Sequence, residues 1–122
     1  PADTGLTATL TTTAANSKIL VIVNQNGWMR LSGSNSSGST LDLLQDSVIK
    51  ITYVQYMTYQ SGAATDSRHG TVSGSYLSDV VSSASTAVVF KTQFYLSDAT
   101  VGNISINGAG YSSTMILMEI AA

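Results

Sequence analysis

Short runs of apolar and β-branched residues alternate along the chain with clusters of Gly, Ser, Asn and Asp, a pattern typical of strands joined by turns. No stretch combines a sustained helical period with capping residues. The pattern predicts strands at Leu6–Thr13, Lys18–Gln25, Trp28–Ser32, Leu41–Gln45, Val48–Thr58, Val72–Leu77, Ala87–Leu96, Val101–Asn107 and Thr114–Ile120. We therefore expect one domain over residues 1–122, an all-β antiparallel β-sandwich that is jelly-roll-like.

Several segments between these strands are expected to be loops. Ser32–Thr40, with the sequence SGSNSSGST, is predicted to be a flexible inter-strand loop, with a domain boundary as the alternative. Ser61–Ser75 contains Arg68, His69 and several Gly residues and is the best candidate for a long exposed loop. The dipeptide Asn26-Gly27 favours a tight turn, so Trp28 is expected near a loop.

Apolar residues occupy one or both faces of the predicted strands. In Ala87–Leu96 they alternate with polar residues, which indicates one buried face. In Lys18–Gln25 and Thr114–Ile120 they occupy both faces, although a strand of a two-layer sandwich has only one inner face. The second face needs a cover, and we expect another subunit, with a fully internal strand as the alternative. The candidate subunit interface consists of Leu20, Ile22, Ile116 and Met118.

Composition removes several classes of function. Charged residues make up 10% of the 122 residues and the net charge is −2, so nucleic-acid binding has no electrostatic footprint. There is no Cys, which excludes disulfides and thiolate metal sites. No apolar run approaches the ~20 residues of a membrane helix, and membrane insertion is not expected.

The residues offer little for catalysis. His69 is the single His, and its neighbours Asp66, Ser67 and Arg68 invite a catalytic triad. Sequence neighbours on a loop cannot generally adopt that geometry, so we expect no catalytic residues and no enzyme. No metal site or cofactor is expected either, and a Ca²⁺ site could arise only from converging distant loops. Glu119 is expected to reach solvent at the end of the final strand, with pairing to Arg30 or Lys91 as an alternative.

Binding surfaces are the remaining route to a function. Arg68, His69 and Asp66 form a candidate receptor-facing loop. Trp28 is a candidate aromatic contact, since aromatic side chains near loops stack on sugars or anchor interfaces, and it is equally a candidate core residue.

Four segments, in order, resemble a domain common in bacteriophage tail fibres and other virion structural proteins. Ala15–Val21 followed by Val23–Gly27 is similar to its "SSKILV-x-VNQNG" opening, and Leu41–Ser47 to its "LRLLRDS" segment. Phe90–Phe94 resembles "YKVQF", and Ser113–Ile120 resembles the closing "STITLMEI". Asp42 and Gln45 depart from that pattern, which has basic residues at these positions.

The resemblance implies a tail-fibre or tip domain that forms a homotrimer, contacts other virion proteins and presents loops to a host surface receptor, often a polysaccharide. It places the chain in the virion and supplies no catalytic residues. The first alternative is a monomeric extracellular carbohydrate-binding module that uses Trp28 and neighbouring Tyr residues as a stacking platform. The second is a purely architectural virion subunit, such as a capsid decoration or tail collar.

Overall fold

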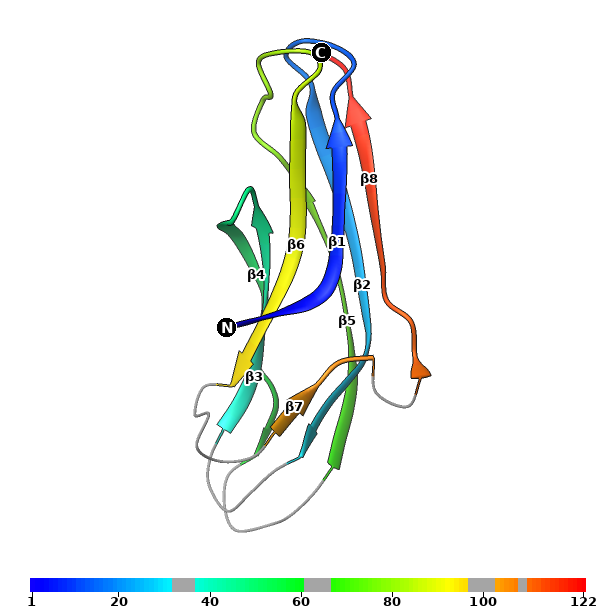
Figure 1. Cartoon of the computed structure of the whole chain (residues 1–122). Helices are drawn as coiled ribbons and strands as arrows, with labels where there is room; N and C mark the ends of the chain where they lie inside the picture. Colours follow the sequence, from blue (N-terminus) through cyan, green and yellow to red (C-terminus); the bar gives the residue numbers. More distant parts are fainter. Residues whose placement is uncertain (32–36, 61–66, 97–102, 108–109) are drawn as a thin grey trace.

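The computed structural model describes residues 1–31, 37–60, 67–96, 103–107 and 110–122, and its regular elements are all strands (Figure 1). They are β1 (Ala2–Thr11), β2 (Lys18–Leu31), β3 (Ser37–Gln45), β4 (Val48–Gln60), β5 (Ser67–Leu77), β6 (Ala87–Leu96), β7 (Asn103–Ser105) and β8 (Thr114–Ile120). No helix in the described ranges has the length and hydropathy that a membrane crossing requires.

The strands form two antiparallel sheets that pack face to face (Figure 1). One sheet has the order β1-β6-β3-β4. In the other, β2 pairs with β5 along one edge and with β7 and β8 along the opposite edge. The expectation of an all-β sandwich is confirmed.

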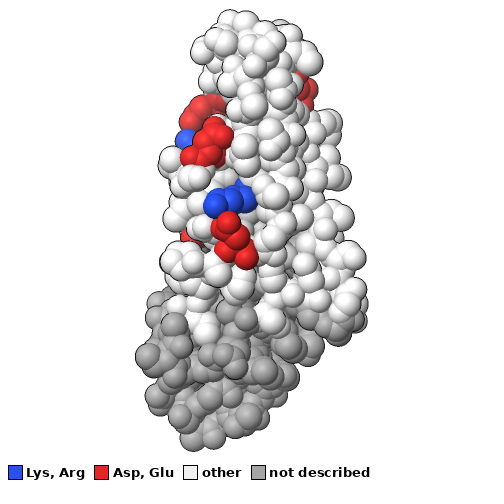
Figure 2. Space-filling model, viewed as in Figure 1, with Lys and Arg blue, Asp and Glu red and all other residues white. Residues whose placement is uncertain are grey.

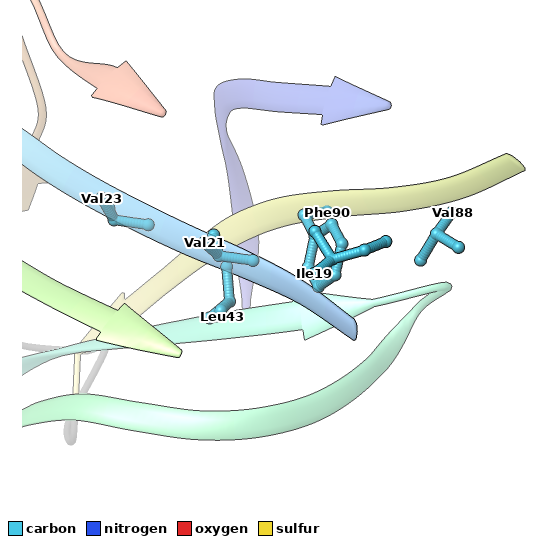
Figure 3. Packing of buried hydrophobic residues seen from close by; sticks show 6 residues of the cluster. All are labelled: Ile19, Val21, Val23, Leu43, Val88 and Phe90. Carbon is cyan, nitrogen blue, oxygen red and sulfur yellow. The ribbon is translucent and has the colours of Figure 1, made fainter. Parts of the chain in front are cut away.

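The core lies between the sheets and is built from alternate residues of β2, β3 and β6. Its buried members are Ile19, Val21, Val23, Leu43, Val88 and Phe90, each exposed by 2% or less (Figure 3). Their spacing confirms that one face of β6 and one face of β2 point inward. Burial of each such side chain stabilises the fold by about 1.5–3 kcal/mol.

The predicted turn at Asn26-Gly27 is wrong, because β2 continues from Lys18 to Leu31. The ladder with β5 pairs Gln25 with Val72 and Trp28 with Gly70, so two residues of β2 face one residue of β5. Such an extra residue is accommodated as a β-bulge. The Asn26 N–H donates to the Ser113 hydroxyl at 2.9 Å, which holds the bulged backbone in the sheet.

Two predicted loops are also strands over part of their length. Residues 37–40 of the predicted loop Ser32–Thr40 belong to β3, and residues 67–75 of the predicted loop Ser61–Ser75 belong to β5. The remaining residues of each, 32–36 and 61–66, lie outside the described residues. Edge strand β5 is made by its backbone ladder with β2 and needs few apolar side chains, which is why its composition resembled a loop.

Gly74 shows why a residue that normally weakens strands stands within β5. A Cβ at this position would overlap the ring of Tyr53, which reaches across from β4. The absence of a side chain lets the ring lie against the β5 backbone. Burial, with Tyr76 nearby, raises the pKa of Tyr53 to about 12.

A chain of hydrogen bonds runs beside the apolar core from the buried side chains of Thr4, Thr92 and Gln25 to the exposed side chain of Asn107. The hydroxyl of Thr92 donates to Gln25 Oε1 at 3.2 Å, and Gln25 Nε2 donates to the Ser113 hydroxyl at 2.8 Å. The single hydroxyl hydrogen of Thr92 is already used in the bond to Gln25, so the hydroxyl of Thr4 is the donor in the Thr4–Thr92 bond. The hydroxyl of Ser113 donates to Asn107 Oδ1. These bonds satisfy both amide groups of Gln25, a fully buried polar side chain that would otherwise be costly.

We expect Gly74→Ala to destabilise the domain by about 1–3 kcal/mol, because the new methyl group displaces the Tyr53 ring from the β4–β5 contact. Urea unfolding measures the change. Ser75→Ala, an exposed neighbour on the same strand, is the control and is expected to stay within about 0.5 kcal/mol of wild type. Equal stability of Gly74→Ala and wild type would contradict the role given to this glycine.

Candidate interaction surface

The outer face of the β1-β6-β3-β4 sheet carries a row of polar and charged side chains. Asp3 accepts hydrogen bonds from Lys91 Nζ at 3.2 Å and from Gln93 Nε2 at 2.7 Å. In the same row of paired residues, the Thr52 hydroxyl donates to Asp42. Figure 2 shows the charged atoms gathered in a few patches on the viewed side of the molecule. Asp3 and Lys91 keep 55% and 27% of their side chains exposed, whereas Asp42 is buried at 2% exposure.

The outer face of the other sheet is apolar along β2, β8 and the end of β5. The register places Leu77, Leu20 and Met118 in one row across the three strands, and Ile22 and Ile116 in the next. Leu77, Ile116, Met118 and Ile120 are each between 44% and 50% exposed, and Ile22 is 38% exposed. We call this surface the apolar face; it consists of Leu20, Ile22, Leu77, Ile116, Met118 and Ile120.

The four residues predicted as a subunit interface all lie on the apolar face. The expectation that β2 and β8 carry apolar residues on both faces is confirmed, and the exposure of Ile22 shows that β2 is not a fully internal strand. The candidate interface did not include Leu77 and Ile120. The alternation in Thr114–Ile120 places Ile120 on the face of Ile116 and Met118. Leu77 joins the face only through the pairing of β5 with β2.

The sequence suggested that Glu119 reaches solvent at the end of the last strand. In the structure its side chain is held by hydrogen bonds instead. Its carboxylate accepts hydrogen bonds from the Thr13 N–H at 2.9 Å and hydroxyl at 2.8 Å, the Ala14 N–H at 3.0 Å and the Ser17 hydroxyl at 2.7 Å. All these donors belong to the connection between β1 and β2. The side chain therefore ties the last strand to the first connection of the chain.

Hydrogen bonds without a cation hold this charge. The ion pairs recorded among the described residues join Lys50 to Asp79 and Lys91 to Asp3, and neither involves Glu119. Donation from Ser17, Thr13 and Ala14 lowers the pKa of Glu119 to about 2, since every partner favours the ionised form. If the carboxyl were protonated, its hydrogen would face N–H groups that cannot accept a hydrogen bond. Some of the hydrogen bonds to Glu119 would then be lost.

The other predicted site residues lie near one end of the β5-β2 ladder. The backbone register pairs Trp28 with Gly70 and His69 with Met29, and Arg68 lies opposite Arg30. The structure thus brings the backbone of the predicted aromatic contact next to that of the predicted receptor residues, although 40 positions separate Trp28 from Arg68 in the sequence. Asp66, the third receptor candidate, lies outside the described residues.

The chain matches no protein family model, and comparison with curated proteins and with solved structures finds no match either. Within the described ranges, no group of three or more His, Asp or Glu side chains could hold a metal ion. The apolar face is therefore the most distinctive surface that the described residues offer.

We expect Glu119→Gln to lower the midpoint of thermal unfolding at pH 7, because the amide –NH₂ would face N–H and O–H donors. Since the pKa of Glu119 is depressed from 4.5 to about 2, its stabilisation is complete above pH 4.5 and is lost as the pH falls toward 2. The wild-type midpoint should therefore fall more steeply than that of the variant over this range.

Asp79→Asn is the control for this prediction, because the Asp79 side chain is 90% exposed and lies 3.9 Å from Lys50. It should leave both the midpoint and its pH dependence close to wild type. Parallel pH curves for Glu119→Gln and wild type would refute the role of this carboxylate.

Proposed function

We propose that this chain is a structural domain of a bacteriophage tail fibre, which forms a homotrimer through the apolar face and presents another part of its surface to a host receptor. The observation that carries the proposal is the apolar face, an uncharged sheet surface left open to water. The ordered resemblance of four segments to virion fibre domains supports the same assignment.

Burial of the apolar face contributes to association. Four of its side chains are 44–50% exposed, Ile22 is 38% exposed and Leu20 is partly buried, so together they offer about 250 Å² of apolar surface, no more than the largest patches on ordinary monomers. Burial at about 25 cal/mol per Å² contributes roughly 6 kcal/mol per copy. Association costs on the order of 4–15 kcal/mol, so this face drives assembly only together with further contacts.

The polar end of the β5-β2 ladder supports a role in receptor contact. Trp28, Arg68 and His69 have neighbouring backbone positions there, and aromatic and arginine side chains are the types that most often anchor interfaces. Tail-fibre domains of the kind that the chain resembles contact host polysaccharides, for which an aromatic residue beside polar groups is suited.

The alternative of a monomeric carbohydrate-binding module is less well supported. It requires a row of exposed aromatic side chains, whereas among the side chains that the structure describes Tyr111 is 60% exposed and Tyr53, Tyr76, Phe94 and Tyr95 are partly buried. It also leaves the apolar face without a purpose. A purely architectural virion subunit remains compatible with the apolar face and differs only in lacking receptor contact.

Light scattering across a dilution series tests the assembly. We expect a mass three times that of the 12.7 kDa chain, and a monomer after Met118→Lys, because a buried lysine charge in the apolar contact is costly. Thr11→Lys adds the same charge to an exposed position of β1 and should leave the mass unchanged. A wild-type monomer at every concentration would exclude the assembly and favour the binding module.

Binding to an array of bacterial surface polysaccharides tests receptor contact. The double substitution Arg68→Ala/His69→Ala is expected to reduce binding at least tenfold, whereas Lys50→Ala, on the other sheet, should not change it. Unfolding midpoints near wild type would show that each variant is folded. Undiminished binding by the double variant would remove this end of the ladder from the proposal, and absence of binding by wild type would favour the purely architectural role.

A further inference from the structure

Beyond Ile22 the outer face of β2 changes from apolar side chains to amides. Strand parity places Asn24 and Asn26 on the same outer face as Ile22, because the residues that alternate with them are buried. The connection between β7 and β8 brings a third amide beside them, since the Asn107 N–H donates to the Asn26 carbonyl at 3.2 Å. We call Asn24, Asn26 and Asn107 the amide row. It adjoins the apolar face and contains none of its residues.

Each amide of the row is held at one end by a serine. The three hydrogen bonds run from the Ser73 hydroxyl to Asn24 Oδ1 at 2.9 Å, from Asn26 Nδ2 to the Ser112 carbonyl at 2.7 Å and from the Ser113 hydroxyl to Asn107 Oδ1 at 2.5 Å. These bonds restrict the rotation of the amide groups. A side chain that is already ordered loses less conformational entropy when it binds a ligand, so the row is prepared for binding.

The opposite end of each amide is free. Asn24 Nδ2, Asn26 Oδ1 and Asn107 Nδ2 find no hydrogen-bond partner among the described residues. None of these three atoms is among the buried polar atoms that lack a partner in the described part of the chain, so all three are open to solvent. The row therefore offers N–H donors on Asn24 and Asn107 and a carbonyl acceptor on Asn26. Neighbouring hydroxyl groups, which both donate and accept, match this arrangement.

Tyr111 supplies an aromatic side chain next to the amide row. It immediately precedes Ser112, whose carbonyl holds Asn26. At 60% exposure it is the most exposed of the large hydrophobic side chains that the structure describes. Ligand sites commonly combine an apolar or aromatic surface with a few oriented polar groups. An aromatic ring beside amides suits a sugar, because the ring covers the C–H groups of the sugar while the amides bond to its hydroxyls.

The residue types of this surface also decide which ligands it does not favour. The amide row, its three serines and Tyr111 include no Lys, Arg, His, Asp or Glu. A phosphate or carboxylate ligand would gain no charge-assisted hydrogen bond there, and a divalent cation would find no carboxylate. An uncharged ligand rich in hydroxyl groups is the class that this surface favours.

We infer that the amide row and Tyr111 form a binding site for a neutral oligosaccharide. Sugar hydroxyls accept hydrogen bonds from Asn24 and Asn107 and donate to Asn26 Oδ1, while the sugar ring packs on Tyr111. The inference rests on the receptor contact of the proposed function and adds to it a ligand class and a second surface, separate from the polar end of the β5-β2 ladder. Ser73, Ser112 and Ser113 position the amides in this site.

Calorimetric titration with a panel of short neutral oligosaccharides of hexoses and N-acetylhexosamines tests the site on the protein in its solution assembly. We expect wild type to bind at least one of them, and Asn24→Ala/Asn107→Gly to raise the dissociation constant at least about tenfold, because two oriented hydrogen bonds are lost. Glycine is used at position 107 because Asn107 has a φ of +52°, where alanine is strained. Gln93→Ala removes an amide from the other sheet and should leave the dissociation constant within about twofold of wild type.

Two substitutions of Tyr111 separate stacking from a general effect on the surface. Tyr111→Ala should raise the dissociation constant at least about tenfold, whereas Tyr111→Phe keeps the ring and should stay within about threefold of wild type. Because the side chain is 60% exposed, both variants should keep the unfolding midpoint of wild type, and that measurement shows that each is folded. Equal affinity of Tyr111→Ala and wild type would overturn the inference.

The outcomes separate the inference from the function on which it rests. Oligosaccharide binding that Asn24→Ala/Asn107→Gly weakens and Arg68→Ala/His69→Ala leaves unchanged would support a separate site at the amide row. Binding that only the Arg68→Ala/His69→Ala variant weakens would overturn the inference and leave the proposed receptor contact intact. Absence of binding to every neutral oligosaccharide by a wild-type trimer would also overturn the inference, while the proposed fibre assembly would stand.

Discussion

The sandwich depends on β2, a strand that is hydrogen-bonded along both edges and carries apolar side chains on both faces. Its inner residues form the centre of the core, and its outer residues Leu20 and Ile22 form the centre of the apolar face. A strand with two apolar faces is weakly specified in register, because a shift by one residue exchanges one apolar set for another. Gln25 fixes the register of β2, because its buried amide is hydrogen-bonded only when Thr92 and Ser113 lie next to it.

The sequence was sufficient to predict which side chains are buried where apolar and polar residues alternate along a strand. Val88 and Phe90 face the core, Lys91 does not, and the two faces of β2 and β8 follow from the same period of two. It was insufficient where backbone pairing overrides composition. Asn26-Gly27 continues a strand because β5 and Ser113 engage the bulge, and Gly74 belongs to a strand because a ring on another sheet requires the space.

The candidate site was predictable to the same extent. Parity identified Ile116 and Met118, whereas Leu77 required the β5–β2 pairing. Glu119 was misplaced because cations were the partners considered for it, and backbone N–H groups of a distant turn cannot be recognised in a sequence. Its position nevertheless bears on the apolar face, because the strand that Glu119 ties down supplies three of the six residues of that face.

The pairing of β8 with β2 has a consequence for synthesis on the ribosome. Ser17 and Glu119 are in contact although they lie 102 residues apart, so β2 emerges long before the strand that will cover its free edge. During that interval an unpaired edge with apolar residues on both sides is available to other nascent chains. On a polysome those neighbours are identical chains translated from the same message. Folding of this domain and contact with neighbouring nascent chains therefore compete in time until β8 has been synthesised.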